Sequence, residues 1–345
     1  MIIGLVYAVG GLLVLAAASD QFVKGAVRLA VVMRIAPVIV GSVIVGFGTS
    51  APEMVVSGIA AAEGNLDIGV GNVIGSNVAN ISLVLGCATL MAAVPVKPSI
   101  LRREVPISVA SVVVFAALIQ GDITRLEGIV LLLLLLGALA FILRSSPRHP
   151  AGTPQSLPSE RSAAAPTEPA GPETSADAEL GALPGELGEL VGDAAPSGTT
   201  ESIRTIVGLA LVAGSAWFVV EGAERIADEL DLTGGFIGFT LVAIGTSAPE
   251  LFTAVAAARR GEIELLIGNL LGSNMFNSFA VGGVIALAGP GRVLESNLSV
   301  GGSTMMVAIV VVSALMMITK LKVSRAEGIV LLAMWVGSVV VLATI

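Results

Sequence analysis

The feature that most limits how this chain can fold is a motif that occurs twice inside apolar sequence. The six residues GTSAPE stand at 48–53 and again at 245–250. A second pattern, GNxxGSNxxN, follows each copy, at 71–80 and at 268–277. Every matched position is offset by 197 residues. Each half of the chain therefore carries one glutamate, Glu53 or Glu250, in sequence hydrophobic enough to cross a bilayer, where a carboxylate is costly and indicates function.

Composition places the chain in the membrane class. It is 55% hydrophobic and 13% charged over 345 residues, with a mean hydropathy of +0.95. The one cysteine, Cys87, and the one histidine, His149, offer no thiolate or imidazole cluster for a metal. Carboxylate, hydroxyl, carboxamide and carbonyl oxygens remain, and these suit hard cations. The absence of a basic cluster or an aromatic series argues against a nucleic-acid partner.

Apolar segments between charged turns predict ten membrane spans, five on each side of a polar segment. The duplication extends beyond the motifs, since GAVRLA at 25–30 returns as GAERIA at 222–227, and RLEGIVLL at 125–132 returns as RAEGIVLL at 325–332. Five is odd, so the second unit should insert upside down, which predicts inverted repeats with a site near the midplane. The predicted spans are 2–19, 36–62, 67–94, 104–120, 124–143, 203–220, 236–258, 263–288, 300–319 and 326–345.

We therefore expect an all-α polytopic membrane protein of ten transmembrane helices, built from a first repeat at 1–143 and an inverted second repeat at 203–345. Residues 144–202 hold nine of the sixteen prolines and nine acidic residues, which predicts a disordered linker. With both termini outside, 15 of the 18 Lys and Arg residues fall on the inner side, as the positive-inside rule requires. This orientation places the linker in the cytoplasm of a cell-membrane protein.

Proline explains why the first motif should interrupt its helix. A proline inside a helix removes one hydrogen bond and pushes against the carbonyl four residues earlier. Unsatisfied carbonyls are tolerated at membrane depth only where they line a cavity. Glu53 and Glu250 follow the prolines directly and add charge. The carbonyls that Pro52 and Pro249 should free or disturb are those of Gly46, Gly48 and Thr49, and of Ala243, Gly245 and Thr246.

The second motif places small and polar residues on one helix face. Asn72, Ser76 and Asn80 fall at i, i+4 and i+8, and Asn269, Ser273 and Asn277 repeat the stripe. The glycines form small-xxx-small pairs that allow close helix approach. Serine and asparagine supply neutral oxygens for Ca²⁺ or Na⁺. Alternatively, Asn72 and Asn269 brace the broken helices without touching an ion, and Asn77 and Asn274 make only interhelical hydrogen bonds.

These motifs resemble the two α-repeats of the sodium/calcium exchangers, within the cation/calcium antiporter superfamily. The resemblance covers the chain except the linker, with α-repeats at about 36–94 and 236–288. It implies a Ca²⁺ site that overlaps with or is flanked by Na⁺ sites at the midplane, and no cofactor. The ligands it implies are the central carboxylates of Glu53 and Glu250, backbone oxygen of Thr49 and Thr246, the hydroxyls of Ser50, Ser247, Ser76 and Ser273 at the Na⁺ sites, the amides of Asn80 and Asn277, and the carbonyls of Gly46 and Ala243.

One position separates the subfamilies. Some relatives carry aspartate where this chain has Asn277, and the potassium-dependent members resemble that pattern. Proton/calcium exchangers typically carry an additional glutamate in the second motif, which this chain lacks. One Ca²⁺ balances the charge of two central carboxylates, and two or three Na⁺ balance or slightly exceed it. We therefore expect Na⁺-driven, K⁺-independent exchange of Ca²⁺ by alternating access, performed by a monomer.

Three alternatives remain open. A proton-coupled or K⁺-dependent Ca²⁺ antiporter belongs to the same superfamily. A cation channel is disfavoured because the inverted repeat supplies alternating access and the sequence shows no ring of pore-lining acids. An intramembrane enzyme is not expected, because no histidine or lysine within the spans could act as a base beside a serine.

Overall fold

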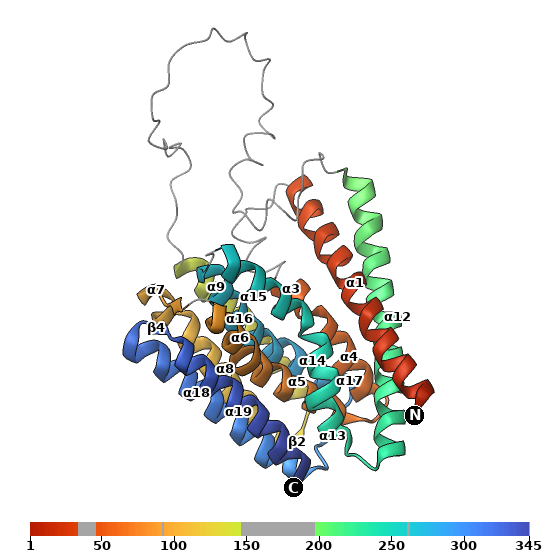
Figure 1. Ribbon diagram of the computed structural model, residues 1–345. Helices are drawn as coiled ribbons and strands as arrows, with labels where there is room; N and C mark the ends of the chain where they lie inside the picture. Colours follow the sequence, from red (N-terminus) through yellow and green to blue (C-terminus); the bar gives the residue numbers. More distant parts are fainter. Residues whose placement is uncertain (34–45, 92, 146–196, 261–262, 345) are drawn as a thin grey trace, which may run out of the picture.

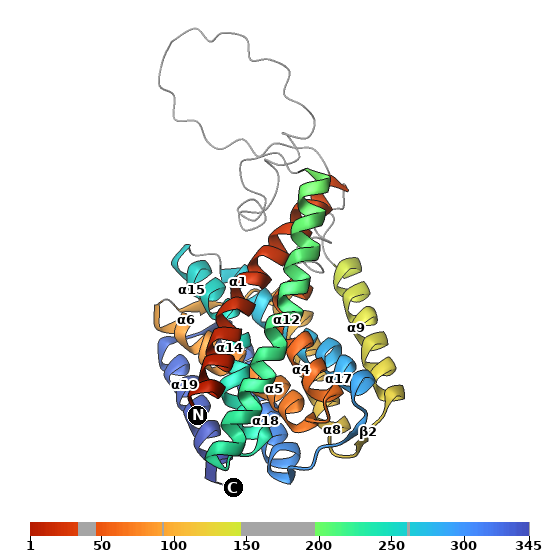
Figure 2. The same ribbon diagram turned by 90° about the vertical axis from the view of Figure 1, so that its right-hand side faces the viewer.

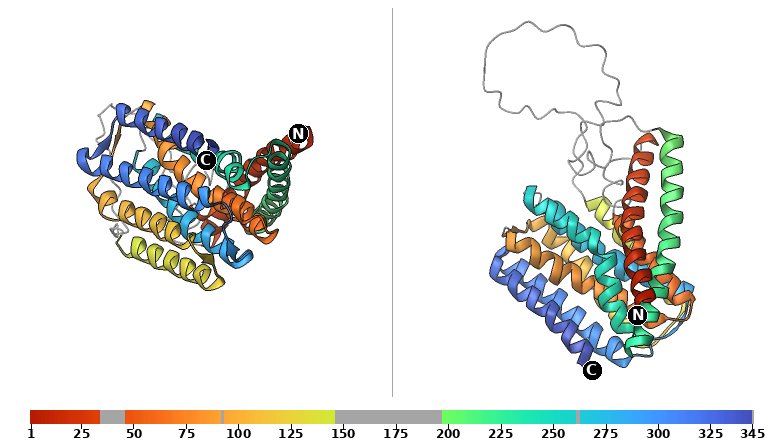
Figure 3. Two further views of the ribbon diagram at one scale, coloured as in Figure 1. Left: turned by 90° about the horizontal axis from the view of Figure 1, so that it is seen from below. Right: turned by 45° about the vertical axis from the view of Figure 1, so that its right-hand side comes forward.

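A pair of long helices forms one side of the molecule. The computed structural model describes residues 1–33, 46–91, 93–145, 197–260 and 263–344. Helices α1 (Ile2–Val32) and α12 (Gly198–Leu230) run antiparallel along their whole lengths (Figures 1 and 3). Small residues bring the two backbones together, with Gly11 against Val219 and Gly25 against Thr205. The pair stands beside the remaining helices, which form a compact bundle (Figure 2).

Two interrupted helices form the centre of that bundle. One consists of α5 (Leu66–Val78), the π-helical segment η2 (Ala79–Val84) and α6 (Leu85–Met91). The other consists of α16 (Ile263–Phe276), η4 (Asn277–Val281) and α17 (Gly282–Ala288). Of the apolar stretch long enough to cross a membrane, 83% is buried in each of these two, against at most 44% in the other membrane-length helices. The GNxxGSNxxN motifs therefore lie on the two central helices.

The GTSAPE motifs lie at helix breaks against this centre. In the first half, α3 (Gly46–Thr49) is followed by α4 (Ala51–Ala62). In the second half, α13 (Gly234–Ile237), η3 (Gly238–Val242) and α14 (Ala243–Thr246) lead to α15 (Ala248–Arg260). Ser50 and Ser247 occupy the breaks with nearly the same backbone angles, φ −89° and ψ 4° against φ −86° and ψ 5°. The proline of each motif then stands in the first turn of the new helix, where it is tolerated.

The outer helices and four short strands complete the fold. The helices are α7 (Pro98–Arg102), α8 (Glu104–Leu118), α9 (Arg125–Ser145), η5 (Asn297–Gly302), α18 (Ser303–Lys320) and α19 (Arg325–Thr344). Strand β1 (Val94–Pro95) pairs antiparallel with β4 (Lys322–Val323), and β2 (Asp122–Ile123) pairs antiparallel with β3 (Gly291–Arg292). Each strand pair joins the first half of the chain to the second.

Contacts between the halves come in matched sets. Where an element of the first half packs on one of the second, the duplicated partners pack in the same way with the halves exchanged. The matched sets are α6–α19 with α17–α9, α8–α16 with α18–α5, α4–α17 with α15–α6, and β1–β4 with β3–β2. The duplication in the sequence is therefore also a duplication of contacts.

Within the described residues, the expected all-α architecture holds apart from four two-residue strands. Seven helices in the described residues are long and apolar enough to cross a membrane. Helices α1 and α12 are longer than the first and sixth predicted spans, 2–19 and 203–220: α1 continues to Val32, and α12 runs from Gly198 to Leu230. At 1.5 Å per residue α1 is about 46 Å long, well over a hydrocarbon core of about 30 Å. Most of the predicted linker lies outside the described residues, but its ends, 144–145 and 198–202, are helical.

Candidate functional site

Two buried carboxyl groups meet at the centre of the bundle. Glu53 lies in the first turn of α4 and Glu250 in the first turn of α15, and each side chain is only 1% exposed. They are close enough for their charges to repel each other. Helix N-termini favour negative charge, which partly offsets the cost of burial. The structure therefore brings together the two glutamates that the sequence singled out.

Hydroxyl groups from both motifs lie beside these carboxylates or are buried in the same bundle. Ser247 Oγ donates to Glu53 Oε1 of the other half over 3.5 Å. Ser273 lies beside the Glu250 carboxyl. Ser50, Ser76 and Thr246 are buried, whereas Thr49 is half-buried. Gly46 is the first residue of α3.

The backbone carbonyl of Ala243 differs from expectation. The sequence predicted that Pro249 disturbs the hydrogen bonding around it. Instead, this carbonyl accepts from the Ser247 amide over 3.0 Å, and Thr246 Oγ1 lies 3.4 Å away. The reason is that Pro249 begins a new helix at α15 and does not interrupt α14, which ends with its last hydrogen bonds intact.

The asparagines of the second motif link the two central helices. Asn80 Nδ2 donates to Asn274 Oδ1 over 3.2 Å, and Asn274 Nδ2 donates to the Asn77 carbonyl over 3.3 Å. Asn77 Nδ2 donates to Ser278 Oγ over 3.2 Å and approaches Met306 Sδ at 3.5 Å. The interhelical hydrogen bonds considered for Asn77 and Asn274 are therefore present.

Asn80 and Asn277 do not continue a regular α-helical stripe. The α-helices end at Val78 and Phe276, and both asparagines lie in the π-helical segments η2 and η4. A π turn widens the helix and shifts side chains away from i+8 spacing, and such segments are frequent at functional sites. The prediction of one continuous α-helical face was wrong from Asn80 and Asn277 onward.

Several buried oxygens of the site have no hydrogen-bond partner among the described residues. Leaving a buried polar group unsatisfied is costly, so each such atom needs an explanation. A cation is one, because it coordinates lone pairs that no donor reaches. The atoms are Glu53 Oε2, Glu250 Oε2, Ser50 Oγ, Ser273 Oγ, Asn77 Oδ1, Asn80 Oδ1 and Asn277 Oδ1.

Three residues that the sequence did not single out complete the surroundings. Ser57 lies four residues after Glu53 on the same face of α4 and accepts from Asn72 Nδ2 over 2.9 Å. That spacing could have identified it. Ser278 and Met306 could not have been found from the duplication, because the position matching Ser278 is Ile81.

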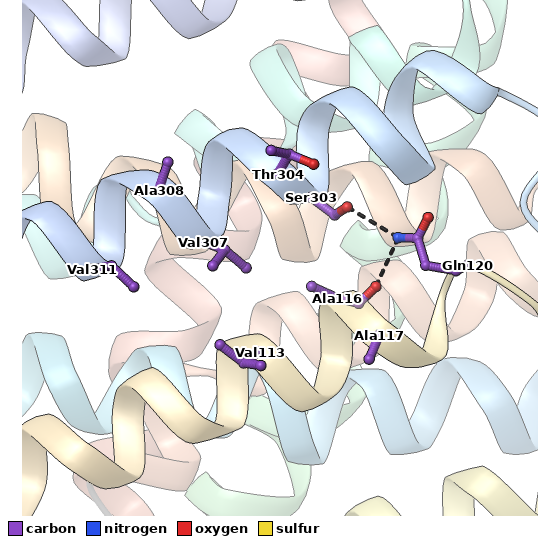
Figure 4. A pocket seen from close by; sticks show the side chains of 9 residues that line it. All are labelled: Val113, Ala116, Ala117, Gln120, Ser303, Thr304, Val307, Ala308 and Val311. Carbon is purple, nitrogen blue, oxygen red and sulfur yellow. Dashed lines mark hydrogen bonds between the residues drawn. The ribbon is translucent and has the colours of Figure 1, made fainter.

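An open groove of about 450 Å³ lies elsewhere, between α8 and α18 (Figure 4). Its walls are mainly alanine and valine, and Gln120 closes one end by donating to the Ala116 carbonyl over 2.8 Å and to Ser303 Oγ over 3.1 Å. None of the residues singled out from the motifs lines it. The buried oxygens around Glu53 and Glu250 remain the candidate functional site.

Comparisons with known proteins agree on one family. The family model described as sodium/calcium exchanger protein matches residues 3–144 and 202–344. The putative antiporter CaxA of Alkalimonas amylolytica is 33% identical over 345 residues, covering 98% of each chain. The sodium/calcium exchanger MaX1 of Methanosarcina acetivorans is 30% identical over 368 residues, covering 99% of this chain and 97% of its own.

A solved structure supports the same assignment. The sodium-calcium exchanger NCX_Mj, soaked with 10 mM Na⁺ and zero Ca²⁺, superimposes with a TM-score of 0.63 at 26% identity and 98% coverage of both chains. The chain is thus a multi-pass membrane protein and a cation/calcium antiporter, not an enzyme. It belongs to the sodium/calcium exchanger family.

Proposed function

We propose that this protein exchanges Na⁺ for Ca²⁺ across the cell membrane by alternating access, independently of K⁺. The observation that carries the proposal is the pair of buried carboxylates, Glu53 and Glu250, contributed by duplicated helices and surrounded by unpartnered oxygens. Two negative charges at bilayer depth require a counter-charge. One Ca²⁺ supplies it, and so do two or more Na⁺.

The ligand set of the proposed site combines charged and neutral oxygens. Glu53 and Glu250 hold Ca²⁺ at the centre, with Asn80 and Asn277 completing that position. The hydroxyls of Ser50, Ser247, Ser76 and Ser273, with backbone oxygen of Thr49 and Thr246, form the flanking Na⁺ sites. The carbonyls of Gly46 and Ala243 lie at the edges. Carboxylate, hydroxyl and carbonyl oxygens are the ligands that hard cations prefer.

The charge of the site also supports the proposed coupling. Asn277 is neutral, so a Na⁺-loaded site needs no K⁺ to balance a third carboxylate. The sodium/potassium/calcium exchanger 3 of Mus musculus is 31% identical, but over only 36% of this chain. An empty site would carry two charges into the apolar barrier during the conformational change. This penalty would favour exchange over leak.

In this proposal the chain forms ten spans in two inverted five-helix repeats, with both termini outside and segment 144–202 in the cytoplasm. It acts as a monomer, and α1 with α12 slides as one unit past the central bundle. The matched contacts of the halves support this mechanism, because exchanging their roles produces a second conformation open to the other side.

The test is Ca²⁺ uptake into vesicles containing the purified protein. Uptake is measured against an imposed Na⁺, K⁺ or H⁺ gradient, with an ionophore-clamped membrane potential. We expect uptake to follow the Na⁺ gradient and to be unchanged when choline replaces K⁺. Uptake that follows pH and ignores Na⁺ would identify a proton-coupled antiporter, and a requirement for K⁺ would identify a K⁺-dependent exchanger. Ca²⁺ flux that needs no gradient of Na⁺, K⁺ or H⁺ would indicate a channel.

A further inference from the structure

Asn72 forms hydrogen bonds with three other side chains near the site. It is fully buried on α5 and does not belong to the proposed ligand set. Its amide Nδ2 donates to Ser57 Oγ over 2.9 Å. Its Oδ1 accepts from Ser76 Oγ over 3.4 Å and from Thr246 Oγ1 over 3.2 Å. One amide therefore joins two helices of the first half to the broken helix of the second.

The direction of these hydrogen bonds matters for cation binding. A hydroxyl has one proton and two lone pairs. When Ser76 donates its proton to Asn72, only lone pairs face the remaining directions, which is the arrangement that a cation needs. The contact with Thr246 holds the α14 segment whose backbone oxygen is a proposed ligand. Ser57 accepts from the Asn72 nitrogen and so holds the amide with its oxygen toward Ser76 and Thr246.

The second half lacks the hydroxyl that holds this amide. The position that matches Ser57 is Ala254, which is buried but has no hydroxyl. The matching asparagine, Asn269, is only partly buried, and its Nδ2 has no partner among the described residues. Ser273, which matches Ser76, lies beside the Glu250 carboxyl and makes no hydrogen bond to Asn269 among the described residues. The two halves therefore differ at a point where their motifs are identical.

We propose that Asn72, held by Ser57, is a positioning residue that pre-organises the Na⁺ site formed by Ser76 and Thr246, and that the matching Na⁺ site of the other half is less pre-organised because Ala254 has no hydroxyl. This inference rests on the proposed exchange function. It predicts two inequivalent Na⁺ sites, with Asn72 acting on Na⁺ affinity and leaving Ca²⁺ at the central carboxylates nearly unaffected.

The experiment compares three single substitutions in the full-length protein. Ser57→Ala removes the group that holds Asn72, and Ala254→Ser supplies its counterpart to Asn269. Ser111→Ala is the matched control, because Ser111 is equally buried and donates over 2.8 Å to the Ser108 carbonyl on α8, outside the network. Half-saturating Na⁺ and Ca²⁺ concentrations are measured by flux in vesicles, and by the rise in melting temperature when NaCl or CaCl₂ replaces choline chloride in detergent.

We expect Ser57→Ala to raise half-saturating Na⁺ by about threefold to tenfold, the effect of one lost buried hydrogen bond. Half-saturating Ca²⁺ should change by less than about twofold, and Ala254→Ser should lower half-saturating Na⁺. Ser111→Ala should alter neither ion.

Two outcomes would overturn the inference while the exchange function stands: unchanged Na⁺ dependence in Ser57→Ala, or equal shifts for both ions. If the unsubstituted protein shows neither Na⁺-driven Ca²⁺ flux nor stabilisation by either ion, the proposed function itself fails and the inference fails with it.

Discussion

At the scale of single residues, the central question is what offsets the burial of two neighbouring carboxylates. Glu53 and Glu250 each retain one oxygen without a hydrogen-bond partner among the described residues. The hydrogen bond from Ser247 and the helix N-termini compensate only part of the desolvation cost. A bound cation is the simplest additional stabilisation, so the affinity for ions and the stability of the fold should be coupled.

This coupling predicts that neutralising either carboxylate abolishes transport without unfolding the protein. Glu53→Gln and Glu250→Gln should each reduce Na⁺-driven Ca²⁺ uptake by more than about 100-fold, since a neutral amide no longer balances a divalent charge. The melting temperature without added ions should stay the same or rise, because one buried charge is removed. Glu63→Gln, at the exposed end of α4, is the control and should transport normally. Calcium uptake that persists in both site variants would contradict the assigned role.

The sequence identified Glu53 and Glu250 because their motif is duplicated, which distinguishes them from the other acidic residues of the chain. A motif that returns at the same offset, with a charge in apolar sequence, has few structural explanations. Residues that act without a duplicated counterpart were missed for the same reason, as with Ser57 and Ser278. The widening of the helix at Asn80 and Asn277 was also not predictable, because a π segment arises from packing and has no local sequence signature of its own.

At the scale of elements, close helix approach depends on the glycines of the second motif. A Cβ at Gly75 would collide with the Phe239 carbonyl, and one at Gly71 would meet the Gly235 carbonyl. The small-xxx-small interpretation is thus confirmed for the first half. For Gly268 and Gly272 it stays a prediction, because the residues that match 235 and 239 lie outside the described residues.

Gly75→Val should therefore destabilise the packing of α5 against η3 severely. The obstacle is backbone, which cannot move aside as a flexible side chain can, so the cost should exceed about 3 kcal/mol. The measurement is the fraction of protein that remains monodisperse after heating, as determined by size-exclusion chromatography. Gly137→Ala on the exposed face of α9, where an added Cβ meets no described atom, should leave this fraction unchanged or raise it. Equal heat resistance of both variants would contradict the close-packing role.

The long helix pair is held together at one end by a buried ion pair. Arg28 Nε donates to Glu201 Oε1 over 2.7 Å, and Arg204 contacts the other oxygen at 3.1 Å. Glu201 is 1% exposed, although its position in the sequence indicated part of a disordered linker. Sequence alone could not place it, because its main partner lies 173 residues away.

Removing that carboxylate should loosen α1 from α12. Glu201→Ala leaves two arginines facing each other, and the loss of one partner from a buried pair costs about 3 kcal/mol. The expected result is a lower melting temperature that high salt partly restores, since salt screens the remaining repulsion. Asp20→Ala, which removes an exposed i,i+4 partner of Lys24 on the same helix, should have little effect. A drop in melting temperature of the same size in both variants would contradict a specific role for the ion pairs of Glu201.

At the scale of the whole molecule, packing interfaces hold the two halves together more than the covalent linker does. Helices α5 and α6 of the first half pack against α13, η3 and α19 of the second, and both strand pairs cross between the halves. Such interfaces bury the central helices from both sides. The covalent connection between α9 and α12 should therefore be dispensable once the protein has folded.

Cutting the connection tests both the interlocking and the orientation. With a protease site inserted after Ala170, cleavage should leave the two fragments bound to each other in mild detergent, with the Na⁺-dependent rise in melting temperature retained, because every matched contact survives. In sealed vesicles of known orientation, the protease should cut only from the cytoplasmic face. The same site inserted after Gly121, in the exposed turn before β2, should be cut only from the opposite face. Fragments that separate would show that the linker holds the halves together, and cleavage of both sites from one face would reject the proposed arrangement in the membrane.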